Sequence, residues 1–224
     1  MPDLQLVIFD CDGVLVDSED ISNDVLARML TKEGLATTLG QARSAYQGLL
    51  LGDVLAAAEA RLGRRLPAGW LERYERERAD AFRSGLQAVA GAAAAVRAVT
   101  AAGVEVSVAS QGKLAKTRLS LALSGLSDLF SEHALFSAEQ VPRGKPHPDL
   151  FLHAAQTMGA PPGRCAVVED TPSGVTAAVR AGMRAIGYAA HSDRAALALA
   201  GAEIVHTLNA LTGLLGLDAA QRTG

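Results

Sequence analysis

Short runs of hydrophobic residues constrain the fold of this chain more than any other feature of its sequence. The first run, residues 4–9, ends abruptly at Asp10. Four later runs are equally short and apolar, namely residues 104–109, 134–136, 166–168 and 185–188. Because their hydrophobicity is continuous and not alternating, these runs predict strands buried on both faces, as in a parallel sheet covered by helices.

Helix-like stretches lie between these runs, at residues 92–102, 113–124, 148–158, 172–181 and 192–200. Strands that alternate with helices over this length predict a doubly wound, Rossmann-like α/β sheet. In such sheets ligands bind beyond the carboxyl ends of the strands. We therefore expect the polar residues that follow the runs to converge there: Asp10, Ser110, Glu169 and Asp170.

One segment, residues 18–83, contains no convincing strand and has hydrophobic residues at helical spacing, for example Ile21, Val25 and Met29. The sequence thus predicts two domains. One comprises residues 1–17 and 88–224 and contains the predicted sheet, and the other is an all-helical insertion of residues 18–87.

Charge and hydropathy narrow the classes of partner. The 21 Lys and Arg residues against 24 Asp and Glu give a net charge of -3, without the basic excess typical of nucleic-acid binding. No apolar run reaches the roughly 18 residues of a membrane helix, and no signal peptide is evident. We expect a cytoplasmic monomer or small homo-oligomer that binds neither nucleic acid nor membrane.

Two carboxylates, Asp10 and Asp12, follow the first predicted strand. Residues separated by one lie on the same side of an extended chain, so both can face one site, and Gly13 then permits a tight turn. Carboxylates crowded in this way repel one another unless a cation or a shared proton lies between them. The pair therefore indicates a nucleophile or metal ligand beside a proton donor, although a polar turn alone would also explain it.

Candidate phosphate ligands follow in two places. Ser110 ends a predicted strand, and Gln111 stands at an expected helix start, where a hydroxyl and backbone N–H groups can hold an anion. Lys145 lies in a proline-flanked loop, where its ammonium could neutralise a phosphoryl group. A helix cap and a surface lysine are the plain structural alternatives.

A second acidic pair, Glu169 and Asp170, ends another predicted strand just before a helix. Carboxylate oxygens are the ligands that Mg2+ prefers, so this pair, together with Asp10 and Asp12, predicts a Mg2+ site. The alternative is that these acids only cap the helix that follows.

Taken together, these motifs give the chain a clear resemblance. FDCDGVLVDSE, VASQGK, RGKPHPDLF and VVEDTPSGVTAAVRAGM are similar to the motifs of the haloacid dehalogenase superfamily, in its phosphatase and β-phosphoglucomutase-like branch with a helical cap. The resemblance covers essentially the whole chain. It implies that Asp10 is the nucleophile that forms an aspartyl-phosphate, and that Asp12 is the general acid and then the general base.

The same resemblance assigns the remaining residues of the site. Ser110 and Lys145 would bind the transferring phosphoryl group. Asp10, the backbone carbonyl of Asp12 and Asp170, helped by Glu169, would hold Mg2+. The implied enzyme is a Mg2+-dependent phosphoric monoester hydrolase that acts on a small phosphate ester, most simply a sugar phosphate.

Three rival functions remain. Dehalogenases of the superfamily lack the second aspartate, because a departing halide needs no proton, and here Asp12 is present. Sugar-phosphate mutases share the core residues, but Leu51 stands where β-phosphoglucomutases carry an arginine. A non-catalytic phosphoacceptor or binding protein belongs to a different class, and phosphate release would distinguish it from an enzyme.

Overall fold

The computed structural model describes residues 4–46 and 49–217 of the 224-residue chain. Contacts within the chain divide it into two compact units. The first unit combines Met1–Val16 with Ala88–Gly224, and the second is Asp17–Gln87. Each unit has its own buried core.

A six-stranded parallel sheet forms the centre of the first unit. Its strand order is β3-β2-β1-β4-β5-β6, so that the first strand lies in the middle. All four residues of β1 are buried, as its unbroken apolar run predicts. The predicted doubly wound α/β fold is therefore confirmed. The strands are β1 (Leu6–Phe9), β2 (Glu105–Ser110), β3 (Leu135–Ser137), β4 (Cys165–Glu169), β5 (Arg184–Tyr188) and β6 (Glu203–Val205).

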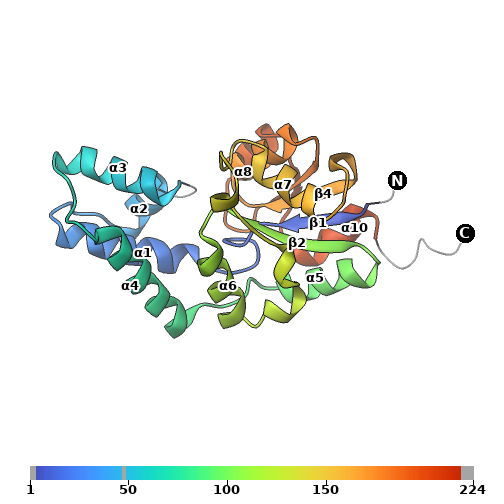
Figure 1. Ribbon diagram of the computed structural model, residues 1–224, viewed down its shortest axis with the longest axis horizontal. Coiled ribbons are helices and arrows are strands. Elements are labelled where there is room, and N and C mark those ends of the chain that lie inside the picture. The colour runs from blue at the N-terminus through green and yellow to red at the C-terminus, as the bar shows by residue number, and fades with distance from the viewer. Residues whose placement is uncertain (1–3, 47–48, 218–224) are drawn as a thin grey trace, which may run out of the picture. The chain divides into compact units, whose positions relative to one another are not determined.

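Helices cover both faces of this sheet. Figure 1 shows α7 and α8 on one face and α5 with α10 on the other. The helices of this unit are α5 (Ala92–Ala101), α6 (Leu114–Leu123), α7 (Asp149–Thr157), α8 (Pro172–Arg180), α9 (Arg194–Leu199) and α10 (Leu211–Leu215). Short 3-10 turns occur at η1 (Ser127–Leu129), η2 (Glu132–Ala134), η3 (Ala138–Gln140), η4 (Pro162–Arg164) and η5 (Leu208–Ala210).

The second unit consists of helices in its described residues, 17–46 and 49–87. Its helices are α1 (Glu19–Lys32), α2 (Leu39–Tyr46), α3 (Leu51–Leu62) and α4 (Trp70–Gly85). The helical spacing of Val25 and Met29 places both in the core of this unit, which also contains Trp70 stacked on Tyr74 at 6.0 Å between ring centroids. Among the residues that the structure describes, no helix is both long and apolar enough to cross a membrane.

Candidate active site

The predicted site residues lie at the carboxyl edge of the sheet, where β1, β2 and β4 end side by side. Phe9 is in register with Val108 of β2 and with Val168 of β4. The next residue, Asp10, donates its backbone N–H to the Val168 carbonyl over 2.9 Å. In an open parallel sheet this edge, beside the central strand, is where ligands bind.

Lys145 joins two of the carboxylates at this edge. Its ammonium lies 2.5 Å from Asp10 Oδ1 and 2.6 Å from Glu169 Oε1, and it also donates a hydrogen bond to the Ala109 carbonyl over 3.0 Å. The Lys145 side chain is only 3% exposed. The structure thus brings Lys145 into contact with Asp10, 135 positions before it in the sequence, and with Glu169, 24 positions after it.

Burial sets the electrostatics of this cluster. It raises the pKa of Asp10 from 3.8 to about 7, and the nearby charges of Glu169 and Asp12 add to the rise, while Lys145 opposes it. Burial alone would lower the pKa of Lys145, but Asp10 and Glu169 outweigh it and hold that pKa above its usual value. Two acids, Asp10 and Glu169, contact the ammonium of one buried lysine, so further positive charge would stabilise the ionised form of Asp10.

Asp12 lies in the tight turn that follows β1. Gly13 has a φ of +75°, a left-handed conformation that glycine adopts without strain, and its N–H bonds to the Val16 carbonyl over 2.9 Å. The Asp12 carboxylate forms an ion pair with Lys116, whose side chain is 10% exposed. Lys116 is a residue of this site that the sequence motifs do not indicate. Its only signal is a lysine in the helix that begins after Ser110.

Ser110 and Gln111 occupy the end of β2. Ser110 is fully buried, and its hydroxyl accepts the Gly112 N–H over 3.1 Å. The Gln111 side chain instead turns to the loop that carries Lys145. Its Oε1 accepts the Lys145 N–H over 3.0 Å, and its Nε2 donates to the Lys145 carbonyl over 3.4 Å.

Glu169 and Asp170 end β4, and protein donors hold Glu169 firmly. Its Oε2 accepts hydrogen bonds from the Thr171 N–H and hydroxyl, over 3.0 and 2.8 Å, while its Oε1 faces Lys145. A Cβ on Gly174 would fall 1.9 Å from the Glu169 carboxyl carbon. The glycine therefore leaves the space that this carboxylate fills beneath the first turn of α8.

The buried carboxylates fit a divalent cation with oxygen ligands. Asp170 lies against the turn that follows Asp12. Its Oδ2 is so close to Gly13 that a Cβ on that glycine would lie 2.2 Å away. Within residues 4–46 and 49–217, no three His, Cys, Asp or Glu side chains gather closely enough to enclose a metal ion alone. Mg2+ does not need such a group, since it usually binds one or two carboxylates and keeps waters or substrate phosphate oxygens.

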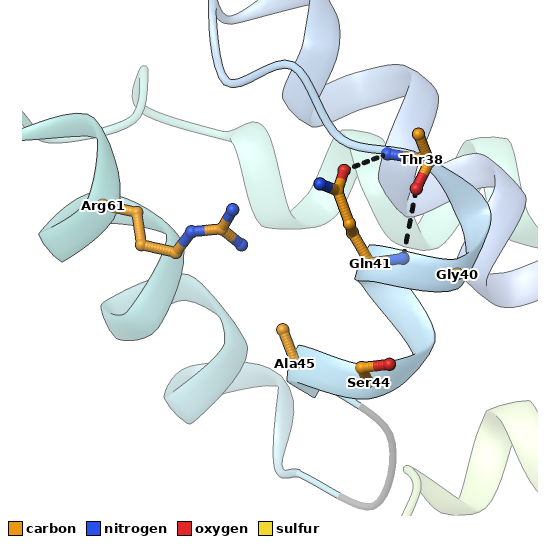
Figure 2. Close-up of a pocket in the computed structure, with 6 residues that line it drawn as sticks. All are labelled: Thr38, Gly40, Gln41, Ser44, Ala45 and Arg61. Carbon is orange, nitrogen blue, oxygen red and sulfur yellow. Dashed lines mark hydrogen bonds between the residues drawn. The ribbon is translucent and has the colours of Figure 1, made fainter.

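The helical unit contains a separate open pocket of about 640 Å³ between α2 and α3. Figure 2 shows Thr38 and Gln41 hydrogen-bonded to each other at the start of α2. Arg61 donates a hydrogen bond to the Tyr46 hydroxyl over 2.9 Å. The described residues that line the pocket include no carboxylate, thiol or imidazole that could activate a hydroxyl: they are Thr38, Gly40, Gln41, Ser44, Ala45 and Arg61.

Comparison with known proteins decides the family. The family model of the haloacid dehalogenase-like hydrolases matches residues 4–182, which include all the site residues described above. The chain belongs to the haloacid dehalogenase-like hydrolase family. The predicted family and its enzymatic character are thus confirmed.

Two curated relatives of this haloacid dehalogenase-like chain are phosphatases of Escherichia coli K12. The 6-phosphogluconate phosphatase is 31% identical over 85% of each chain, and hexitol phosphatase A is 30% identical over 83% of each chain. A haloacid dehalogenase family hydrolase from Deinococcus radiodurans R1, solved with bound phosphate and sodium, is 33% identical. It superimposes with a TM-score of 0.79, covering 97% of this chain and 98% of its own.

Proposed function

We propose that this protein is a Mg2+-dependent phosphatase that hydrolyses a small phosphorylated metabolite, such as a sugar phosphate, through an aspartyl-phosphate on Asp10. The observation that carries the proposal is the buried ammonium of Lys145 between Asp10 and Glu169. A carboxylate that attacks a phosphate needs fixed positive charge beside it. The two E. coli phosphatases, which match over most of the chain, support this reaction class.

The first half of the reaction transfers the phosphoryl group to the enzyme. An Asp10 carboxylate oxygen forms a bond to phosphorus, and the bond from phosphorus to the leaving oxygen breaks. Asp12 donates a proton to that oxygen, so the product departs as an alcohol. Lys145 and the Ser110 hydroxyl bind the phosphoryl oxygens, with the backbone N–H of Gln111 as a further donor.

The second half returns the enzyme to its starting state. Asp12, now ionised, takes a proton from a water molecule, whose oxygen forms a bond to phosphorus. The bond between phosphorus and Asp10 breaks and inorganic phosphate leaves. Lys116, paired with Asp12, keeps this carboxylate directed into the site between the two steps.

Mg2+ would be held by Asp10, the backbone carbonyl of Asp12 and Asp170, with Glu169 supporting the site through Lys145 and Thr171. When bound, the ion would supply positive charge that offsets the repulsion between the attacking carboxylate and the phosphate oxygens. Asp170→Asn is therefore expected to raise the Mg2+ concentration needed for half-maximal phosphate release. An unchanged Mg2+ titration would contradict the ligand role of Asp170.

The proposal gives the two units different tasks. The core, predicted as residues 1–17 and 88–224, carries the chemistry, and residues 18–87 form a cap that selects the substrate. The test is phosphate release from a panel of sugar phosphates and other phosphometabolites with Mg2+, with Asp10→Asn as the inactive control. A parallel assay for glucose 1-phosphate isomerisation tests the mutase alternative. Absence of phosphate release from every panel member would contradict the proposed function.

A further inference from the structure

The loop that carries Lys145 has no helix or strand of its own. Residues 141–148 form bends and turns between the end of η3 and the start of α7. Lys145 is nevertheless one of the most deeply buried charged residues of the described chain, at 8% exposure for the whole residue. An ammonium can be held between two carboxylates from such a loop only if the loop backbone is fixed at that residue.

The side chain of Gln111 contacts the loop backbone at this residue. Its amide accepts from the Lys145 N–H and donates to the Lys145 carbonyl, over 3.0 and 3.4 Å, which is how a neighbouring strand residue would pair with it. Gln111 directly follows the last residue of β2, and its backbone is therefore anchored by the sheet. The Gln111 side chain therefore links the end of β2 to a loop residue that is 34 positions away in the sequence.

The fit between Gln111 and this loop is close. A Cβ on Gly144 would lie 2.7 Å from Gln111 Oε1 and 2.8 Å from Nε2, so a side chain at position 144 would displace the Gln111 amide. Gly144 does not have a positive φ, so a substitution there would act through this contact and not through backbone strain. The absence of a side chain at Gly144 thus leaves room for the Gln111 amide.

Two arginines also form hydrogen bonds within or to this loop, but at residues other than Lys145. Arg143 forms two hydrogen bonds with Asp149, each of 3.0 Å, at the start of α7. Arg180 of α8 donates to the Pro146 carbonyl over 3.0 Å. Neither contacts the main chain of Lys145, so these arginines provide matched controls for the loss of a loop tether.

We propose that Gln111 is a positioning residue, whose side-chain amide fixes the main chain of Lys145 and so places its ammonium between Asp10 and Glu169. This inference rests on the proposed function and adds to it a residue that acts through Lys145. A displacement of about 1 Å in a catalytic group can cost on the order of 100-fold in rate. The long lysine side chain, with its many rotamers, makes such a displacement easy once the backbone is released.

The first test replaces Gln111 with leucine, which has a similar size but cannot form either hydrogen bond. Gln111→Leu is expected to lower kcat for phosphate release by about 10- to 100-fold. Gln111→Glu, which keeps the acceptor for the Lys145 N–H, is expected to lose less. Arg180→Leu, which removes a tether of the same loop, is expected to stay within about threefold of the parent. Unchanged kcat in Gln111→Leu, or an equal loss in Arg180→Leu, would overturn the inference.

The second test asks whether Gln111 acts through Lys145. Binding of inorganic phosphate in the presence of Mg2+ is measured by calorimetry for Gln111→Leu, Lys145→Met and the double variant, after circular dichroism confirms folding. We expect Gln111→Leu to weaken binding in the parent and to cause no further loss in the Lys145→Met background. Equal losses in both backgrounds would show that Gln111 contacts the phosphate independently and would overturn the inference.

A third variant serves if Lys145→Met does not fold. Gly144→Ala places a methyl group against the Gln111 amide without changing either partner, so it should lower kcat as Gln111→Leu does. Combining the two should add little, because one contact has already been lost, and additive losses would contradict the inference. A parent protein that releases no phosphate contradicts the proposed function, whereas an active parent with a fully active Gln111→Leu contradicts only the role of Gln111.

Discussion

Replacement of Lys145 by methionine tests the electrostatics of the buried cluster. Methionine keeps most of the apolar stem and removes the ammonium that contacts both Asp10 and Glu169. The side chains of these two acids are 9% and 1% exposed, so water cannot replace the lost partner without rearrangement. Two carboxylates would then face each other in a buried site, which disfavours their ionised forms.

The expected loss of stability follows from this geometry. Removal of one partner from a buried ion pair costs about 3–5 kcal/mol. A carboxyl left without its partner can also bind a proton, which at pH 7 costs about 4 kcal/mol relative to an ordinary pKa near 4. Because burial already raises the pKa of Asp10 to about 7 in the parent, most of the further loss comes from Glu169. We therefore expect Lys145→Met to lower the free energy of unfolding by about 3–4 kcal/mol at pH 7.

The sign of the pH dependence is fixed by linkage. An acid whose folded-state pKa lies above its unfolded value destabilises the protein at high pH, and this effect disappears as the pH falls toward the unfolded pKa. At pH 5 the uptake of a proton costs only about 1.4 kcal/mol. The deficit of Lys145→Met relative to the parent should therefore shrink by roughly half or more between pH 7 and pH 5.

Urea unfolding followed by circular dichroism, with a chelator to remove divalent cations, measures this deficit. Tryptophan fluorescence is unsuitable, because the single tryptophan, Trp70, lies in the helical unit and not in the unit that contains the sheet and Lys145. Adding Glu169→Gln to Lys145→Met should restore part of the lost stability, since one stranded charge is removed. A loss below about 1 kcal/mol at pH 7, or a loss that does not shrink at pH 5, would refute the reasoning.

Three further predictions concern the catalytic groups. Asp12→Ala should slow the hydrolysis of alkyl phosphates more than that of aryl phosphates, because a weakly basic leaving oxygen needs less protonation; equal losses in kcat would contradict the acid role. Lys116→Met should lower the free energy of unfolding by no more than about 1 kcal/mol, because its pair with Asp12 is partly exposed. The same variant should lower kcat, and an unchanged kcat would show that Lys116 has no role in the site. Gly174→Ala should reduce kcat by displacing the Glu169 carboxylate, and full activity of this variant would contradict the role of that carboxylate.

The parts of the fold with strong local signals could be predicted from the sequence. The run that forms β1 is buried throughout, as its continuous hydrophobicity predicts. The central position of β1 in the strand order was not predicted. The sixth strand, β6, was not predicted, because it begins with the exposed Glu203 and only one of its three residues is fully buried, whereas all three residues of β3 are buried. It forms through pairing with β5, and the Arg184–Glu203 ion pair of 2.6 Å joins these two strands.

In the candidate site, too, some residues could be predicted from the sequence and others could not. Asp10, Ser110 and Glu169 could be placed together because each follows a predicted strand, and parallel strands end at one edge of a sheet. Lys116 could not, because its contact with Asp12 joins residues 104 positions apart and belongs to no strand end. The side-chain role of Gln111 was also hidden, since an amide that pairs with the backbone of a distant loop leaves no periodic or compositional signal.

The nucleophile is the centre of this account, and chemical trapping of the intermediate tests it most directly. The enzyme is quenched during turnover of its best substrate and treated with borohydride, which reduces an acyl phosphate to an alcohol. Peptide mass spectrometry should then find homoserine in place of aspartate at position 10, and no such change without substrate. An active enzyme in which Asp10 stays unmodified, or in which another residue is reduced instead, would contradict the aspartyl-phosphate on Asp10.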